Sequence, residues 1–517
     1  MGKMDKIAYE VRLLNRQFGN INLKEFLDSS HRLHKKIKKL DKTDERYYFI
    51  LFDFSATVSD FAHLFGHKKS AKLAFEIFEE NKGSFKLIVS PFIYYYNAAN
   101  VKTNVITFQE PATQTFKTIE ELVELKNLIW KAIKSVGSTE EAPVECYINL
   151  ANALKQQLRI TEAMYYYDKA IKLDHNLPQG WLNRTDSILL LSKLTNGYNL
   201  NMLVQAKNGY VRALHTGEIP NQSDRVAVAH EKITRIQAVI DKNESGDSSK
   251  EYIDCINSIF SENQNNEYWS FVQAEQLSLS EHALYCDCST REYLDDLSLL
   301  IDKSEKFMPM SMVLNRLKSE FSLARRCYFD YLNASDDTEV YYGDNYYNES
   351  LSIELEKLRT SFKLCFGILD KIGEAICGLF DFYPANNQVY FQSFWQLDTG
   401  NRREKIEAEK NLALLALYSI ATDLNERKDG EWAFYKQWRN DLEHKFVIVQ
   451  KNDIQSDVIS ENIADGVIII NEDEFVRHLK QLLQLTRSAI FSFVYAVKQK
   501  HLKETNGKKE CIDLSEF

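Results

Sequence analysis

A permanent cation, an amide and a titratable imidazole lie within one run of six residues, Arg439-Asn440-Asp441-Leu442-Glu443-His444. A guanidinium can bind a phosphate and stabilise the charge that develops on it, and an imidazole can transfer protons near neutral pH. Neither task needs a metal ion. The combination suits metal-free cleavage of RNA, so Arg439, Asn440 and His444 are the candidate catalytic residues.

A second run in the chain has the same Arg-to-His spacing, and the motif itself also has a simpler, non-catalytic interpretation. Residues 225–230 have the same Arg-to-His spacing, but the four residues between are apolar, and we interpret them as a buried stripe of a helix. Short patterns arise by chance in long chains, so the amide after the arginine is what distinguishes the two runs. The simpler interpretation is an exposed helical face with the i,i+4 pairs Arg439/Glu443 and Asp441/Lys445, each worth only about 0.2–0.5 kcal/mol.

The segment that contains the motif, residues 432–446, is predicted to be a helix. At about 100° per residue, the large apolar side chains of this helix fall on one narrow stripe, which we predict to be its core face. These residues are Tyr435, Trp438, Leu442 and Phe446. Asn440 and His444 then lie together on the opposite side, which faces solvent or a second subunit.

The stretch from Trp438 to His444 resembles the signature of the HEPN superfamily. Members are all-helical domains whose motif is an arginine, a polar residue that is often Asn, three further residues and a histidine. An apolar helix predicted at residues 411–420 precedes the motif, and a long helix predicted at residues 475–498 follows it, as in that family. The resemblance covers residues 286–505. The arrangement of the chain is similar to that of bacterial HEPN proteins with N-terminal helical repeats, which are associated with phage defence or toxin activity.

What the resemblance implies is a metal-independent endoribonuclease whose active site forms across a homodimer interface. It implies that His444 transfers protons at the ribose 2′-OH or the leaving oxygen, that Arg439 holds the phosphate, and that Asn440 positions one of them. The 2′-OH acts as the nucleophile, which makes RNA the substrate. The resemblance calls for neither a cofactor nor a metal.

Two other interpretations stay open at this point. Some HEPN domains bind without cleaving, so the first alternative is a repeat-based binding or scaffold protein whose HEPN-like domain dimerises or binds a nucleotide. The second is a toxin that a partner antitoxin holds silent. Phe446 occupies the position where a toxin branch carries a tyrosine that a partner enzyme modifies, so we do not expect that modification here.

Composition limits the remaining choices. With 517 residues the chain is too long for one compact domain, and its net charge of −10 disfavours a protein that coats nucleic acid non-specifically. Of eight cysteines only Cys286 and Cys288 are close together, so we expect no metal site. The sequence has no run of 18 apolar residues and no apolar signal region at its start, from which we expect a cytoplasmic protein without a membrane segment.

The N-terminal half contains a helical repeat of the 34-residue tetratricopeptide type. Small and aromatic side chains occupy its pattern positions: Tyr147, Leu150, Ala151, Leu154, Ala163, Tyr167 and Ala170. A second repeat starts near Trp181 and has an insertion around residues 195–201. Stacked repeats need neighbours to bury their faces, so we predict an α-solenoid. The solenoid is expected either to bind a protein or peptide in its groove, as a sensor or docking arm, or to serve only as a scaffold that places the C-terminal domain.

The sequence therefore predicts an all-α protein. A tetratricopeptide-like α-solenoid at residues 1–242 is followed by a linker and connecting helix at 243–285, a HEPN-like helical bundle at 286–505 and a polar tail at 506–517. Short β-branched runs at residues 447–449 and 467–470 predict a small β-hairpin beyond the motif helix.

Overall fold

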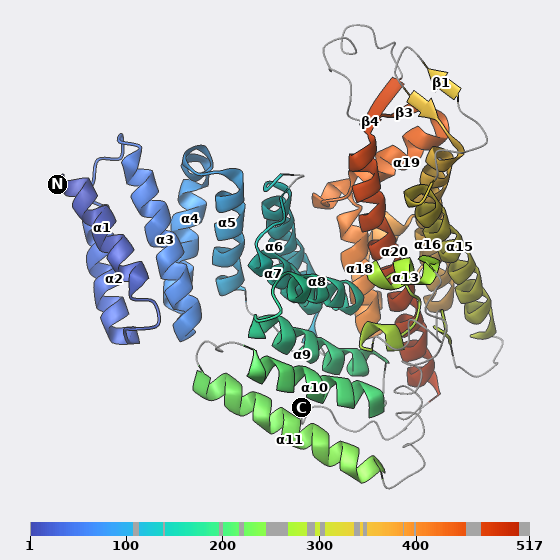
Figure 1. The fold of residues 1–517 in the computed structure, drawn as a ribbon, viewed down its shortest axis with the longest axis horizontal. Coiled ribbons are helices and arrows are strands. Elements are labelled where there is room, and N and C mark those ends of the chain that lie inside the picture. Colours follow the sequence, from blue (N-terminus) through green and yellow to red (C-terminus); the bar gives the residue numbers. More distant parts are fainter. Residues whose placement is uncertain are drawn as a thin grey trace. The chain divides into compact units, whose positions relative to one another are not determined.

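The computed structural model is predominantly helical (Figure 1), which confirms the predicted all-α class. It describes residues 2–106, 113–137, 140–195, 200–216, 222–244, 267–286, 295–299, 306–334, 342–344, 349–385, 387–397, 400–450 and 467–505. The chain forms two compact units, residues 1–113 with 120–153, and residues 114–119 with 154–517. Most of the predicted linker, Cys288 and the predicted tail lie outside the described residues.

The first unit is built from consecutive helices. They are α1 (Lys3–Arg16), α2 (Leu23–Ile37), α3 (Arg46–Phe65), α4 (Lys68–Ile88), α5 (Pro91–Val105), most of α6 (Phe116–Lys134) and most of α7 (Val144–Gln156). Side-chain caps define several of these helices. Asn22 accepts from the backbone N–H of Glu25 at the start of α2, and Ser90 caps α5, which has Pro91 in its first turn.

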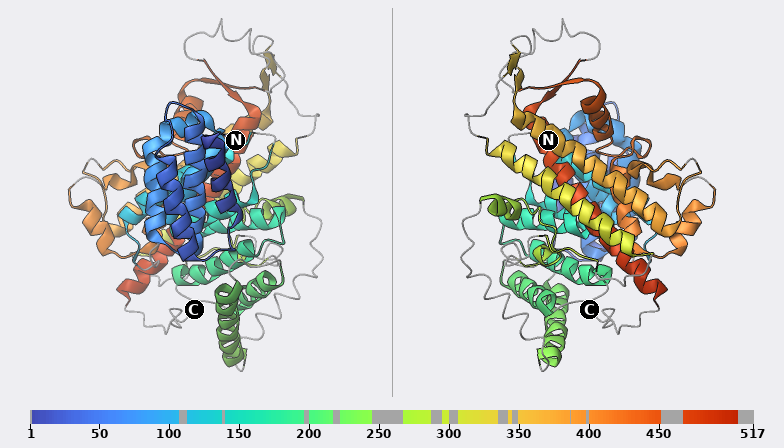
Figure 2. Two further views of the ribbon diagram at one scale, coloured as in Figure 1. Left: turned by 90° about the vertical axis from the view of Figure 1, so that its left-hand side faces the viewer. Right: turned by 90° about the vertical axis from the view of Figure 1, so that its right-hand side faces the viewer.

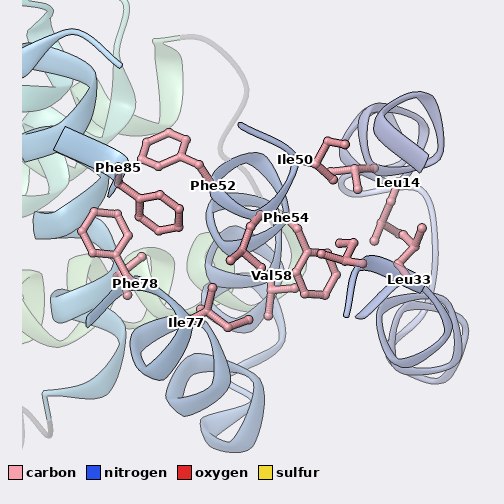
Figure 3. Close-up of a cluster of buried hydrophobic side chains, with 14 of the residues drawn as sticks. Leu14, Leu33, Ile50, Phe52, Phe54, Val58, Ile77, Phe78 and Phe85 are labelled. Carbon is pink, nitrogen blue, oxygen red and sulfur yellow. The ribbon is translucent and has the colours of Figure 1, made fainter. Parts of the chain in front are cut away.

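Helix α3 supplies the central part of this unit's core because it is apolar on more than one side. Phe52 points toward Phe78 and Phe85 on one side of α3, while Ile50 points toward Leu14 on the other (Figure 3). The Phe52 and Phe85 rings pack edge to face, with 5.2 Å between centroids. Burial of this aromatic surface on both sides of α3 holds the neighbouring helices together.

The second unit begins with the rest of the helical repeats: α8 (Ile160–Leu173), α9 (Pro178–Thr195), α10 (Leu200–His215) and α11 (Gln222–Glu244). Each of these helices packs on the next. The pattern positions predicted to be buried are buried, from Tyr147 to Ala170. Gly209 of α10 lies so close to α9 that an added Cβ would be 2.1 Å from Oγ1 of Thr185, so this helix pair needs a residue without a side chain there.

The C-terminal helices of this unit surround one long helix, α20 (Glu472–Glu504). Helices α15 (Met308–Leu332), α16 (Ile353–Phe380) and α18 (Leu412–Asp423) all pack against it, as do α8 and α9. Figure 2 shows α15 and α16 lying together across α20. The segment of α20 from Leu482 to Val497 is buried on all sides. It therefore forms the centre of this core.

Shorter elements complete the C-terminal region. They are α13 (Glu267–Ala274), η2 (His282–Leu284), η3 (Phe391–Gln396), α17 (Arg402–Ala408), η4 (Glu426–Lys428) and α19 (Phe434–His444), together with the strands β1 (Tyr342–Asp344), β2 (Glu349–Leu351), β3 (Phe446–Gln450) and β4 (Val467–Asn471). β1 and β2 pair antiparallel. The predicted site residues lie on α19, and η3 and η4 adjoin this helix.

The two strands predicted beyond the motif are present, but their pairing differs from the prediction. β3 and β4 pair in parallel, with Phe446 opposite Val467 and Gln450 opposite Asn471, so they are not a hairpin. A parallel pair needs a connection of about a dozen residues or more, which residues 451–466 are long enough to provide. The interpretation of residues 225–230 as a buried stripe is also wrong, because Arg225 and His230 are exposed on α11.

Candidate active site

The motif helix α19 is held by aromatic side chains on its inner face. Tyr435 is fully buried, and its hydroxyl oxygen lies 2.9 Å from Nδ1 of His478 on α20. Trp438 stacks on Phe475 of α20, with 5.6 Å between ring centroids and an interplanar angle of 16°. This packing fixes the rotation of α19 about its axis, so the residues between the aromatic positions face outward.

The motif helix ends at His444, two residues earlier than predicted. Lys445 has an extended backbone (φ −131°, ψ 168°), and the β-branched residues that follow form β3. Phe446 is 79% exposed at the first position of this strand, while Val447 and the three residues after it are buried. The predicted core position of Phe446 is therefore wrong, whereas that of Tyr435 is correct.

The structure places Arg439 and Asn440 in direct contact. Nη1 of Arg439 donates to Oδ1 of Asn440 at 3.3 Å, and Nε of Arg439 lies 3.7 Å from Oε1 of Glu443. His444 is at the last position of the helix, with its side chain 74% exposed and Nε2 3.9 Å from Oε2 of Glu443. Glu443 therefore lies between the cation and the imidazole. An anion can approach this face without displacing core residues.

Asp441 and Lys445 have a structural role in the motif helix. Asp441 is buried, accepts a hydrogen bond from Nε2 of Gln437 at 2.7 Å and pairs with Nζ of Lys445 at 3.0 Å. Both i,i+4 pairs expected from the sequence thus form. The Asp441 pair stabilises the end of the helix, while the Arg439 pair is longer and more exposed.

Asp370 of α16 is a charged neighbour of the motif that sequence reasoning missed. Burial raises the pKa of Asp370, and this effect is opposed by a hydrogen bond from the backbone N–H of Phe391 (3.2 Å) and by the positive charges of Arg439, Lys371 and Lys436. The net pKa lies above its usual value. Asp370 is one of four carboxylates in α16 and is far from the motif in sequence, so its position in the sequence gives no signal.

A close backbone contact sets where α19 begins. The connection from α18 passes so near the end of that helix that a Cβ on Gly430 would lie 2.3 Å from the carbonyl oxygen of Thr422 and 2.5 Å from that of Asp423. The carbonyl of Asp423 also accepts from the backbone N–H of Trp432 at 2.8 Å. Only glycine allows this approach, which fixes the start of the motif helix relative to α18.

The motif also borders a cavity. Its volume is about 1250 Å³, and its walls come from η3, η4, the adjoining turns and the outer side of α19. Asn440 is part of the wall, while Arg439 and His444 are not. Asn440 thus connects the cavity with the half-buried guanidinium of Arg439 beside it. Sequence reasoning did not identify this cavity, because its walls come from two stretches that are far apart in sequence, residues 390–397 and 424–440.

Residues 301–500 match the family model described as LA2681-like HEPN. Over these residues the C-terminal region is similar to LA2681-like HEPN domains, and we refer to it as the HEPN domain. The match contains the elements from α15 to most of α20, including α19 with all three predicted site residues. No curated protein and no solved structure matches the chain significantly.

Within the part of the chain that the structure describes, no three His, Cys, Asp or Glu side chains come together as a possible metal site. Among the same residues, no helix has both the length and the apolar character that crossing a lipid bilayer requires.

Proposed function

We propose that the HEPN domain is a metal-independent endoribonuclease that acts in anti-phage defence or growth arrest. The observation that carries the proposal is the outward placement of the Arg439–Asn440 contact and His444 on a helix whose inner face is fully used for packing. None of the three side chains fills the core. Their position suits contact with a substrate better than a structural role.

In the proposed reaction the ribose 2′ oxygen attacks the adjacent phosphorus and the bond from phosphorus to the 5′ oxygen breaks. The 2′-OH loses its proton and the departing 5′ oxygen gains one, with His444 transferring a proton in one of these steps. Arg439 binds the non-bridging phosphate oxygens, where negative charge increases in the transition state. The products are a 2′,3′-cyclic phosphate and a 5′-hydroxyl, and no co-reactant is consumed.

Asn440 has a positioning role in this scheme. Its Oδ1 accepts from Arg439, which holds the guanidinium over the outer face of α19. Glu443 supports the same guanidinium from the next turn. We propose that two HEPN domains form a homodimer in which two copies of this face meet, so that each phosphate is held by charges from both chains. The helical repeats would then serve as a sensor or docking arm for a protein or peptide.

The test is cleavage of total RNA by the purified full-length chain with excess chelator. Wild type is compared with Arg439→Ala and His444→Ala. Loss of a proton-transfer group lowers the rate about 10²–10⁴-fold, and loss of a charge-stabilising donor about 10²–10³-fold. The chain supplies matched controls in Arg225→Ala and His230→Ala, because these residues have the same spacing and are exposed on α11.

Chelator-resistant cleavage that is lost in both motif variants and kept in both controls would support the proposal. Equal cleavage by all five proteins would contradict it and indicate a contaminant or another site. No cleavage by wild type, together with no growth defect on expression, would favour the scaffold alternative. Growth arrest that His444→Ala abolishes would support a role in defence or growth control.

A further inference from the structure

The cavity beside α19 has the charge of a site for anions. Arg427, Lys428 and Lys436 line it, against the single carboxylate of Glu426 among its lining residues. This excess of cations occurs in a chain whose net charge is −10. Exposed Arg427 and Lys436 project from different elements, η4 and α19, so their charges come from two walls. Clustered positive charge of this kind raises the local concentration of an anionic ligand.

The remaining lining residues suit nucleobases better than a simple anion. Amide side chains of Gln392, Gln396, Gln437 and Asn440 line the cavity, and each amide can both donate and accept hydrogen bonds. Such groups match the edges of unpaired bases. Tyr390 is 49% exposed at the same cavity and offers an aromatic face on which a base can stack.

The walls are held in place by hydrogen bonds that do not involve a ligand. Asn425 donates from Nδ2 to the carbonyl oxygen of Gln392 at 2.8 Å, which joins η4 to η3. Oδ1 of the same Asn425 accepts from the backbone N–H of Arg427 at 2.9 Å. Gln396 has a left-handed backbone (φ 58°), a conformation that non-glycine residues keep only where the surrounding structure supports it. The cavity is thus preformed.

The size and position of the cavity indicate that its ligand is a polymer. A volume of about 1250 Å³ exceeds the range of about 300–1000 Å³ that is usual for small-ligand pockets. One wall contains Asn440, which contacts Arg439 at 3.3 Å. A strand whose scissile phosphate is bound by Arg439 can therefore continue directly into the cavity.

We propose that this cavity is a groove for the single-stranded RNA that flanks the scissile phosphate, with Arg427, Lys428 and Lys436 on its phosphates and Tyr390 under a base. This inference deepens the proposed function and rests on it for the location of the scissile phosphate. The groove would determine which RNA is cleaved, while Arg439 and His444 perform the cleavage. It gives an acidic chain a local site for a polyanion.

The experiment measures binding separately from cleavage. A fluorescein-labelled single-stranded RNA of about 12 nucleotides, a length within reported site sizes, is titrated by anisotropy with the full-length His444→Ala chain. Arg427→Glu and Tyr390→Ala are each added to this background. We expect Arg427→Glu to weaken binding about tenfold or more, because it replaces a phosphate contact with repulsion. Tyr390→Ala should weaken binding about fivefold or more through lost stacking.

The matched control is Lys405→Glu, which makes the same charge change at an exposed residue of α17 outside the cavity. In the active background, Arg427→Glu should raise KM for the 12-mer more than Lys405→Glu does, since binding of the substrate is lost.

Equal binding by Arg427→Glu, Tyr390→Ala and the Lys405→Glu control would overturn the groove assignment, even if the chain cleaves RNA. Competition by adenosine monophosphate as strong as by the unlabelled 12-mer would also overturn it, because the site would then be one for mononucleotides. If the chain cleaves nothing but both groove variants lose affinity, the ribonuclease proposal fails, and the cavity is kept as a binding groove for single-stranded RNA without a scissile phosphate beside it.

Discussion

Arg159 and Asp423 form a fully buried ion pair, with 2.5 Å between Nη1 and Oδ2. Arg159 precedes α8 of the helical repeats, and Asp423 is the last residue of α18 in the HEPN domain. Glu162 pairs with the same guanidinium at 2.7 Å. Burial would lower the pKa of Arg159, but the two carboxylates outweigh this effect and keep it raised. Because the Asp423 carbonyl also accepts from Trp432, this pair supports the start of the motif segment.

Removal of this buried cation should destabilise the protein strongly. Arg159→Ala leaves two carboxylates buried without their partner, and the expected loss is about 3–5 kcal/mol. The measurement is chemical denaturation followed by tryptophan fluorescence. Arg235→Ala is the control, since it breaks an exposed pair with Glu231 and should cost less than about 1 kcal/mol. Similar midpoints for the two variants would contradict the structural role of the buried pair.

Gly430 should not tolerate even a methyl group. In Gly430→Ala the new Cβ would collide with backbone carbonyl oxygens that cannot move without shifting α18. We expect a loss of about 1–3 kcal/mol and weaker cleavage, because the start of α19 moves. Gly83→Ala in α4 is the matched control, as nothing lies within 4 Å of its added Cβ. It should stabilise the helix by up to about 1 kcal/mol. Unchanged stability in Gly430→Ala would refute the contact.

Asp370 should make stability depend on pH. Its folded pKa is raised, so the folded state binds this proton more tightly than the unfolded chain does. Stability from this group is therefore present below the unfolded pKa, about 3.9, and is lost as pH rises through the raised folded value. Asp370→Asn removes this loss of stability at higher pH. The melting temperature of the variant should therefore exceed that of wild type more at pH 7 than at pH 4. A difference that shrinks as pH rises would contradict the raised pKa.

Phe446 tests the proposed homodimer. An aromatic side chain that is 79% exposed two residues after His444 is placed to be covered when two motif faces meet. Phe446→Ser should therefore raise the dimer dissociation constant about tenfold, measured by sedimentation equilibrium, with little effect on the stability of the monomer. Leu87→Ser is the control, since Leu87 is 88% exposed on α4. Equal dissociation constants for both variants would place the dimer interface elsewhere.

The sequence by itself determined the helical class, the motif and much of the repeat packing. These are local properties: the apolar spacing of α18 and α20 and the small and aromatic positions from Tyr147 to Ala170 follow from the period of a helix. The burial of Tyr435 follows from the same period. The spacing of Arg439, Asn440 and His444 likewise required no knowledge of the rest of the chain.

Only the tertiary structure decided which distant residues meet. Arg159 and Asp423 are 264 positions apart, and no local pattern pairs them. The strands β3 and β4 were visible as β-branched runs, but their parallel pairing depends on the path of the chain between them. The cavity, likewise, exists only because η3, η4 and α19 converge. Periodicity fixes which side of an element is apolar, whereas packing selects its neighbours, and the charge and shape of the candidate site depend on those neighbours.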